Sequence, residues 1–370
     1  MKIYLIAGEA SGDLHAANLI LAFKKLHPDA EFRAWGGDLM AAAGAEVVKH
    51  YRELAFMGFA EVVRNLPAIL GNLQFCKDDI RAFAPDLVVF IDYPGFNLRI
   101  APFVKSLGIQ TAYYISPQLW AWKAGRVKII RAHIDLMICI LPFEEAWFAQ
   151  HGVKAHYVGH PLLDALAKYP FQTDFKAAHQ LDERPILALL PGSRKQEIRL
   201  KLPIMLAAAS RFTGHQVLVA AAPGQEDSFY TEVAAGKEMR TVRNQTYDLL
   251  RNAEAAMVTS GTATLETALL SCPELVAYKG SRISYAIGRQ LVKVKYISLV
   301  NLILDRLLVR EFIQNDCTAE KLANETEQLL HNTAYRQQLN TGYKELQQTL
   351  GGAGASARAA ALLSNFIKAL

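Results

Sequence analysis

The chain has 370 residues, of which 52% are hydrophobic and 20% are charged, and its formal net charge is +5. This length exceeds what one hydrophobic core usually organises, so two domains are expected. The apolar content excludes a disordered chain. The basic excess is small and no dense basic run occurs, so a nucleic-acid partner is not expected. The sequence contains no apolar run of the length that a membrane-spanning helix needs.

The cysteines and the first residues indicate the compartment. The four cysteines are scattered, with no Cys-x-x-Cys spacing and no zinc-like arrangement with histidine. We therefore expect free buried thiols in a reducing compartment and no metal site. The chain starts with a strand-like segment and a glycine loop instead of a cationic and apolar targeting segment. A cytoplasmic location is expected.

Strand-like and helix-like segments alternate through the first half of the chain. Strands are predicted at 3–7, 32–35, 87–91, 111–115 and 136–140, with a helix from about residue 13 to 26. Such alternation predicts a parallel sheet with helices on both faces. The segment 168–174, Lys-Tyr-Pro-Phe-Gln-Thr-Asp, breaks the pattern and is the predicted linker.

The same alternation returns in the second half, with strands predicted at 186–190, 216–221, 255–259 and 274–278. A glycine-rich break at 351–354 then precedes an alanine-rich helix over 355–370. The expected fold class is α/β, with two Rossmann-like parallel-sheet domains facing a cleft. The predicted domains are 1–170 and 171–345, and the segment 346–370 is expected to return to the first domain.

Two short loops suggest a phosphate-binding pocket in the second domain. Pro-Gly-Ser-Arg at 191–194 and Ser-Gly-Thr at 260–262 each follow a predicted strand, at the sheet edge where open α/β folds bind ligands. Small residues and helix N-terminal amides suit a phosphate, and an arginine adds a charge-assisted contact. A lone Pro-Gly-Ser is usually an ordinary turn, but the second loop favours a nucleotide diphosphate. The residues assigned to this pocket are Pro191, Gly192, Ser193, Arg194, Ser260, Gly261, Thr262 and Glu266, the last as acceptor for a ribose diol.

The first domain contains a candidate general base. The loop Gly8–Asp13 does not match the G-x-G-x-x-G fingerprint, which disfavours a nicotinamide enzyme. Asp92 follows a strongly apolar strand at the edge expected to face the other domain. Burial against Tyr93 and Phe96 would raise its pKa toward a useful range, whereas the alternative is an ordinary helix cap or turn residue.

Two further stretches have both a structural and a functional interpretation. The aromatic segment 113–123 is either core or a surface for a sugar or an acyl chain. Nearby basic residues are either a solvated face or a phosphate anchor; they are Lys123, Arg126, Lys128 and Arg131. In the apolar segment 54–70 one helical face is either core or, if exposed, a reversible membrane contact. The residues of that face are Val62, Val63, Leu66, Ile69 and Leu70. The sequence lacks an Asp-x-Asp pair, so a metal-independent mechanism is expected, without a cofactor.

These residues resemble the lipid-A-disaccharide synthases, glycosyltransferases of the two-lobed B fold. The resemblance extends nearly end to end and rests on motifs that occur in the family's order. The motifs are 7–13 Ala-Gly-Glu-Ala-Ser-Gly-Asp, 57–58 Met-Gly, 91–97 Ile-Asp-Tyr-Pro-Gly-Phe-Asn, 116–122 Ser-Pro-Gln-Leu-Trp-Ala-Trp, 141–144 Leu-Pro-Phe-Glu, 158–161 Val-Gly-His-Pro, 190–194 Leu-Pro-Gly-Ser-Arg, 260–263 Ser-Gly-Thr-Ala and 298–302 Ser-Leu-Val-Asn-Leu.

The resemblance implies an inverting transfer of 2,3-diacylglucosamine from UDP-2,3-diacylglucosamine to 2,3-diacylglucosamine 1-phosphate, giving the β-1,6-linked lipid A disaccharide. Asp92 would deprotonate the acceptor 6-hydroxyl, Arg194 would stabilise the departing UDP, and Glu266 would hold its ribose. By the same resemblance Asn301 lies near the donor, and Glu9 and Ser11 line the cleft. Acylated substrates suit an enzyme peripheral to the inner face of the inner membrane, and related enzymes exchange C-terminal segments in a homodimer.

Two other functions fit the architecture. A UDP-N-acetylglucosamine 2-epimerase shares the two lobes and the nucleotide pocket, but it needs neither an apolar face nor the Trp-Ala-Trp loop. A non-catalytic protein that closes on a nucleotide sugar would need no base at position 92.

Overall fold

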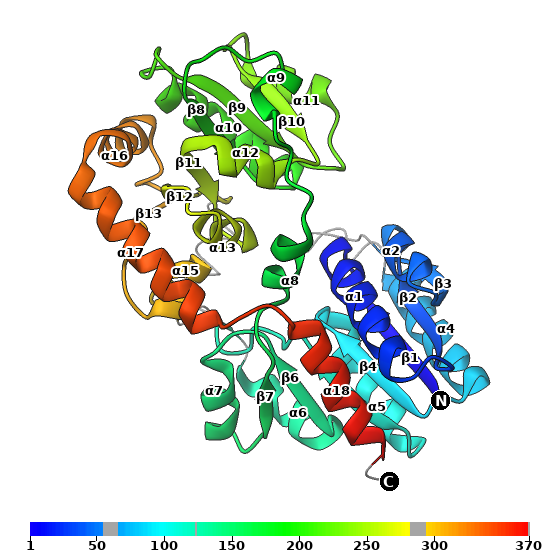
Figure 1. Ribbon diagram of the computed structural model, residues 1–370. Helices are drawn as coiled ribbons and strands as arrows, with labels where there is room; N and C mark the ends of the chain where they lie inside the picture. The colour runs from blue at the N-terminus through cyan, green and yellow to red at the C-terminus, as the bar shows by residue number, and fades with distance from the viewer. Residues whose placement is uncertain (55–65, 123, 282–293, 369–370) are drawn as a thin grey trace. The chain divides into compact units, whose positions relative to one another are not determined.

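The chain folds into two compact α/β units. The computed structural model describes residues 1–54, 66–122, 124–281 and 294–368. One unit combines residues 1–168 with residues 350–370, and the other contains residues 169–349. A parallel sheet forms the centre of each unit, flanked by helices (Figure 1). The predicted fold class, two parallel-sheet α/β domains, is confirmed.

In the described part of the first unit, seven strands pair in the order β3-β2-β1-β4-β5-β6-β7, and their pairings are parallel. The strands are β1 Lys2–Ala7, β2 Glu31–Gly36, β3 Glu46–His50, β4 Leu87–Ile91, β5 Gln110–Tyr114, β6 Leu136–Cys139 and β7 Ala155–Tyr157. The helices between them are α1 Ala10–Leu26, α2 Asp38–Ala42, α4 Leu66–Phe83, α5 Pro94–Ser106, α6 Val127–His133, α7 Glu144–Gln150 and α8 Pro161–Lys168, with 3-10 turns η1 Tyr51–Leu54 and η2 Ala124–Arg126.

The second unit contains a six-stranded sheet in the order β10-β9-β8-β11-β12-β13, also parallel, within the residues described. Its strands are β8 Ile186–Leu190, β9 Gln216–Ala221, β10 Arg240–Arg243, β11 Ala253–Thr259, β12 Glu274–Tyr278 and β13 Glu311–Ile313. Its helices are α9 Phe175–Ala178, α10 Lys195–Ala209, α11 Asp227–Ala234, α12 Thr246–Asn252, α13 Thr262–Leu269, α15 Leu299–Leu304, α16 Ala319–His331 and α17 Thr333–Leu350.

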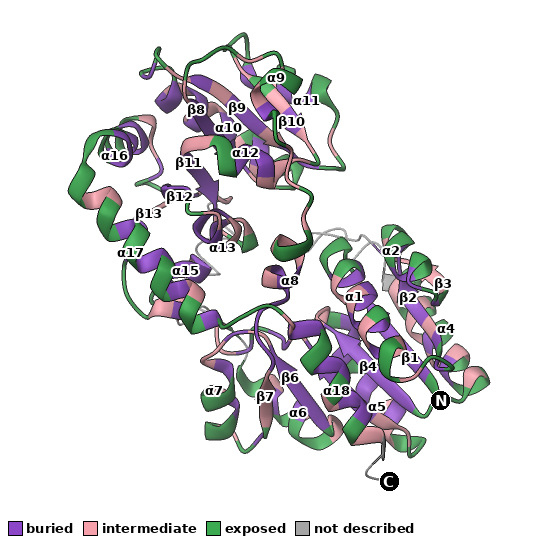
Figure 2. Ribbon diagram, viewed as in Figure 1, coloured by how far each residue is buried: buried purple, intermediate pink, exposed green. Residues whose placement is uncertain are grey.

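Burial on both faces explains why the central strands are apolar along their whole length. In β1, Ile3 and Leu5 belong to the cluster beneath α1, whereas Tyr4 and Ile6 belong to the cluster on the opposite face. Strands covered by helices on both sides have no polar face and give continuous hydrophobic runs. Figure 2 shows this as buried strands beneath helices with exposed outer faces.

The edge strands β3, β7, β10 and β13 were not among the predicted strands. They are short, and most of their residues are only partly buried. In β10, the sequence Arg-Thr-Val-Arg buries one residue, Val242. Charged residues on edge strands discourage pairing with other chains, and they also remove the hydrophobic pattern by which a strand is recognised.

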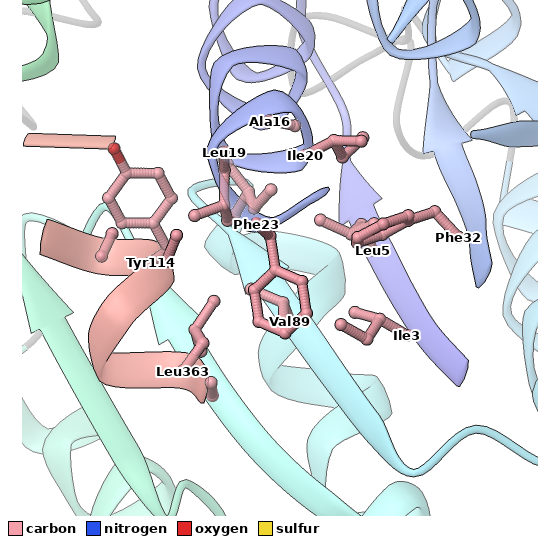
Figure 3. Close-up of a cluster of buried hydrophobic side chains, with 14 of the residues drawn as sticks. Ile3, Leu5, Ala16, Leu19, Ile20, Phe23, Phe32, Val89, Tyr114 and Leu363 are labelled. Atoms are coloured by element: carbon pink, nitrogen blue, oxygen red, sulfur yellow. The ribbon is translucent and has the colours of Figure 1, made fainter. Parts of the chain in front are cut away.

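The last helix, α18 Ala355–Lys368, packs on α1 in the first unit. Figure 3 shows Leu363 of α18 beside Tyr114 and near Leu19 and Phe23 of α1. These side chains belong to one buried cluster. Burying a leucine side chain contributes about 1.5–3 kcal/mol. The chain therefore returns from the second unit to complete the core of the first.

A buried carboxylate holds the start of this helix. Asp164 of α8 accepts hydrogen bonds from the backbone N–H groups of Gly354, Ala355 and Ser356, the last at 2.9 Å. Burial raises the pKa of Asp164, but these N–H groups outweigh that effect and the pKa lies below its usual value. The first-turn amides of a helix have no partner within the helix, so this carboxylate acts as a cap supplied from elsewhere in the fold.

Replacing Asp164 with alanine should destabilise the first unit by about 2 kcal/mol, because three helix amides lose their acceptor. A unit of this size should then unfold roughly 4–8 °C lower, measured by a thermal melt followed by circular dichroism. Asp29→Ala is the control, because Asp29 is exposed in the same unit. Equal melting temperatures for both variants would contradict the capping role.

Candidate active site

Each sheet has one position where the strand order reverses. In the first sheet β1 lies between β2 and β4, and in the second β8 lies between β9 and β11. Connections leave these neighbouring strands in opposite directions, which leaves an open crevice at their carboxyl ends. The candidate residues other than Asn301 follow four of these strands, namely β1, β4, β8 and β11.

The second unit contains a cavity of about 380 Å³ at its reversal point, called the donor pocket below. The structure brings together in its lining seven of the eight residues predicted for it: Gly192, Ser193, Arg194, Ser260, Gly261, Thr262 and Glu266. Pro191 is buried directly after β8. The lining also includes residues that had no predicted role, namely Leu190, Glu197, Ala220, Ala221, Ala222, Pro223, Thr246, Thr259 and Ala263.

Two glycines give the pocket loops their shape. Gly192 has φ +121° and Gly261 has φ +144°, and residues with a side chain rarely adopt these backbone angles. Gly261 is the N-cap of α13, and Arg194 is the N-cap of α10. Backbone amides at the starts of two helices therefore border the pocket, an arrangement that favours an anionic ligand.

Glu266 lies in the pocket lining, one turn into α13. Burial raises the pKa of Glu266 to about 7, and a hydrogen bond with the Tyr247 side chain opposes this rise. The carboxylate form accepts two hydrogen bonds at once, as a ribose diol requires. Tyr247 was missed at the sequence level, because its proximity to Glu266 arises from the packing of α12 against α13.

Asn301 occupies a different kind of place. Its side chain is fully buried in α15, where Nδ2 donates to the Val309 carbonyl (2.8 Å) and the Glu311 carboxylate (2.9 Å). Its Oδ1 accepts from the backbone N–H groups of Leu308 (2.8 Å) and Val309 (3.0 Å). Both donors and both acceptor positions are thus used inside the second unit, and Asn301 is not in the pocket lining. Its predicted contact with the donor stays a prediction, and the geometry gives it a structural role.

Asp92 follows β4 at the reversal point of the first sheet. Its backbone is left-handed, with φ 44°, as is that of Tyr93, with φ 49°. The Asp92 carbonyl accepts hydrogen bonds from Asn97 Nδ2 (2.8 Å) and from the Tyr113 hydroxyl. Two buried side chains therefore stabilise a backbone conformation that aspartate and tyrosine rarely adopt. Asn97 lies in one of the family motifs and Tyr113 in the aromatic segment, but this role depends on contacts that the sequence does not show.

The surroundings of Asp92 change its acidity. Burial raises the pKa of Asp92 to about 6, the negative charge of Glu9 adds to the rise, and the Tyr93 backbone N–H opposes it. Glu9 follows β1 and is exposed, as is Ser11. The structure thus brings Glu9 near Asp92 because β1 and β4 are neighbours in the sheet. A carboxylate with a pKa near 6 is ionised at neutral pH and remains basic enough to accept a proton.

The aromatic segment after β5 is held by Glu144. The buried carboxylate accepts hydrogen bonds from Trp120 Nε1 (3.0 Å), from the Ser116 hydroxyl and from the backbone N–H of Leu141 (3.0 Å). Trp120 is therefore part of the structural framework, whereas Trp122 is 42% exposed. Glu144 was quoted in a motif without a role, and only the fold shows that it anchors this loop.

The other predicted surface residues are only partly described. Lys128 and Arg131 are exposed and Arg126 is half-buried, while Lys123 lies outside the described residues. In the apolar segment, Val62, Val63 and the side chain of Leu66 lie outside the described residues. Leu70 is 56% exposed and Ile69 is half-buried, both on α4. No helix in the described ranges has the length and apolar character needed to cross a bilayer.

Comparison with known proteins gives the family. A family model described as lipid-A-disaccharide synthetase matches residues 3–364. The chain belongs to this family. Among its relatives, the lipid-A-disaccharide synthase of Myxococcus xanthus is 40% identical, with 97% of this chain and 96% of the relative covered. The enzyme of the same name from Syntrophus aciditrophicus is also 40% identical, with 99% and 98% covered.

Solved structures of other proteins share the fold of this chain. The UDP-GlcNAc 2-epimerase of Neisseria meningitidis bound to UDP-GlcNAc superposes with a TM-score of 0.68 at 13% identity, with 100% of both chains covered. The calicheamicin glycosyltransferase CalG4 gives 0.60 at 15% identity, with 100% of this chain and 98% of CalG4 covered. At these identities the likeness shows the fold alone. The family match favours the synthase over the epimerase.

Replacing Asn301 with alanine should destabilise the second unit by about 3 kcal/mol, because buried backbone groups lose their partners. Unfolding should occur roughly 6–12 °C lower in a thermal melt. Asn340→Ala, at an exposed position of α17 in the same unit, should change the melting temperature little. A variant Asn301→Ala with unchanged stability but weakened donor binding would instead support direct contact with the donor.

Proposed function

We propose that the chain transfers 2,3-diacylglucosamine from UDP-2,3-diacylglucosamine to the 6-hydroxyl of 2,3-diacylglucosamine 1-phosphate, with inversion. The products are the β-1,6-linked lipid A disaccharide 1-phosphate and UDP. The chain matches relatives named lipid-A-disaccharide synthase over nearly their whole length, and this match supports the reaction. The observation that carries the chemistry is Asp92, a partly buried carboxylate with a raised pKa at the reversal point of the first sheet.

In this mechanism Asp92 is the general base. Its carboxylate takes the proton of the acceptor hydroxyl while the hydroxyl oxygen attacks the anomeric carbon of the donor from the face opposite UDP. The bond between that carbon and the diphosphate oxygen breaks, which inverts the anomeric configuration. The left-handed backbone at Asp92, held by Asn97 and Tyr113, fixes where the base lies. A positioned base typically contributes about 10²–10⁴-fold to the rate.

The donor pocket would hold the UDP part of the donor. Arg194 and the amides that begin α10 and α13 would neutralise the charge that develops on the leaving diphosphate. Glu266 would accept hydrogen bonds from the ribose diol. Glu9 and Ser11 would line the acceptor side, with Glu9 also raising the pKa of the base. Pro191, Gly192, Ser193, Ser260, Gly261 and Thr262 would form the backbone surface around the phosphates.

The reaction is tested by incubating purified protein with both acylated substrates and following UDP release and the disaccharide by mass spectrometry. Asp92→Asn should lower kcat by about 10²–10⁴-fold while UDP affinity stays within about twofold, because only the proton acceptor is lost. Asp86→Asn is the matched control, since Asp86 lies just before the opposite end of β4 and accepts from the backbone N–H of Lys2. Near-normal turnover in Asp92→Asn would remove Asp92 from the mechanism.

The same base predicts the pH dependence. Only the ionised carboxylate accepts a proton, so kcat/KM should rise with pH through about 6 and fall tenfold per unit below it. Glu9→Gln should shift this midpoint to lower pH, because it removes the negative charge beside Asp92.

The epimerase alternative has a different product. Conversion of UDP-N-acetylglucosamine to its 2-epimer without release of UDP would establish the epimerase function.

Access to acylated substrates supports a location at the inner face of the inner membrane. The exposed Leu70 and the half-buried Ile69 of α4 would contact lipid, while Val62, Val63 and the side chain of Leu66, which belong to the same predicted face, lie outside the described residues. A homodimer with exchanged C-terminal segments is also proposed. The Asp164 carboxylate would cap α18 of its own chain or of a second copy with the same three hydrogen bonds.

Replacing Leu70 with serine should lower the partition of the protein onto liposomes by roughly tenfold, since an inserted leucine contributes about 1.5–3 kcal/mol. Flotation with vesicles of bacterial phospholipids measures this partition. Leu26→Ser is the control, because Leu26 is 50% exposed at the end of α1. Equal flotation of the two variants would exclude this face as the membrane contact.

A further inference from the structure

The donor pocket contains a carboxylate between two cations. Glu197, in the first turn of α10, places Oε1 3.2 Å from a guanidinium nitrogen of Arg194. Its Oε2 lies 3.5 Å from Nζ of Lys201, one turn further along the same helix. Glu197 is part of the pocket lining together with Arg194. The pocket lining therefore contains Arg194 and Glu197 side by side, and the second cation, Lys201, lies buried behind this part of the lining.

Lys201 is unusual because it is almost completely buried. Its side chain is 2% exposed, and its ammonium group donates a hydrogen bond to the Thr259 hydroxyl at the end of β11. Burial lowers the pKa of Lys201, whereas the Glu197 charge raises it. A buried ammonium is costly unless it is paired. Glu197 is the carboxylate that supplies this pairing from the pocket side.

The position of the Glu197 carboxylate matters as much as its charge. It lies directly against Gly192, so closely that a Cβ atom added to Gly192 would overlap Oε2 of Glu197. Nζ of Lys201 would lie 3.4 Å from the same added Cβ atom. A phosphate is expected to approach the backbone at Gly192, where no side chain fills the space. The carboxylate of Glu197, which pairs with Arg194 and Lys201, lies beside this space.

We propose that Glu197 is an internal counter-ion that pairs with Arg194 in the pocket lining and with the buried Lys201 behind it, and that it competes with the UDP diphosphate for their positive charge. This inference rests on the proposed assignment of the pocket to the UDP donor. A diphosphate brings its own negative charge to the two cations, so Glu197 is repelled as the nucleotide binds. The carboxylate weakens UDP binding, keeps Lys201 paired before UDP binds, and assists release of the UDP product.

The helix offers a matched control on its outer surface. Arg199 and Glu232 form an ion pair of the same length, 3.2 Å, between α10 and α11. Neither residue is in the pocket lining. Glu232→Gln therefore removes a carboxylate from a comparable pair on α10 without changing the charge inside the pocket.

The test measures the affinity for UDP by isothermal titration calorimetry at pH 8 and fixed salt. The Glu197 side chain is 32% exposed, so an amide of the same shape fits at this position. Glu197→Gln should bind UDP about three- to tenfold more tightly than the unmodified protein. Glu197→Asp, which withdraws the carboxylate by one methylene, should give a smaller gain. Glu232→Gln should match the unmodified protein. Lys201→Met should weaken UDP binding, and uridine without phosphate should bind all variants alike.

The outcomes separate this inference from the proposed function. Unchanged or weaker UDP binding in both Glu197 variants, with Arg194→Ala still lowering affinity, would overturn the counter-ion role while leaving the donor pocket intact. If the unmodified protein does not bind UDP, or if Arg194→Ala binds it normally, the donor assignment itself fails. Thermal melts of each variant confirm that the compared proteins are folded.

Discussion

The parallel arrangement of the strands determines where everything else in this protein lies. Because the strands of a sheet run in one direction, their carboxyl ends share an edge, and the loops that follow them gather there. The reversal of strand order beside β1 and beside β8 leaves these loops uncovered. Asp92 and Glu9 are neighbours for this reason, as are the loops 191–194 and 260–262. The candidate site residues of each unit therefore lie at the ends of its central strands.

Polar groups at these edges are kept in states that cost stability. Asp92 and Glu266 are carboxyl groups whose pKa burial raises, and Lys201 is an ammonium whose pKa burial lowers. Such groups are tolerated because neighbouring strands and helices fix them in place. The left-handed backbone at Asp92 is tolerated for the same reason, since hydrogen bonds from Asn97 and Tyr113 fix it in place. Preorganised charge at the strand ends is what a glycosyl transfer to an alcohol requires.

A different set of buried polar groups preserves the architecture. Asp164 caps α18, Glu144 anchors the tryptophan loop, and Asn301 ties α15 to the segment before β13. Each is satisfied by several hydrogen bonds, as buried polar groups must be. Both sets contain residues of the family's motifs. Occurrence in a motif thus does not separate a candidate catalytic residue such as Asp92 from one that holds a loop, such as Glu144.

The sequence determined the fold class, the central strands and the two loops that line the pocket of the second unit, because these depend on local patterns. Apolar runs identify β1, β4, β8 and β11, and glycine with small residues after β8 and β11 marks loops that a phosphate can approach. The edge strands β3, β7, β10 and β13 could not be identified, since they are only three to five residues long and mostly half-buried, and polar residues interrupt their apolar pattern. The pair Glu197 and Lys201 has the i,i+4 spacing of one helix, which the sequence contains. Other polar contacts were decided by tertiary structure alone. Tyr247 meets Glu266 because α12 packs against α13, and Asp164 meets the start of α18 because the chain returns to the first unit. No spacing in the sequence encodes the distances between these groups, because they come from elements that are far apart in the chain.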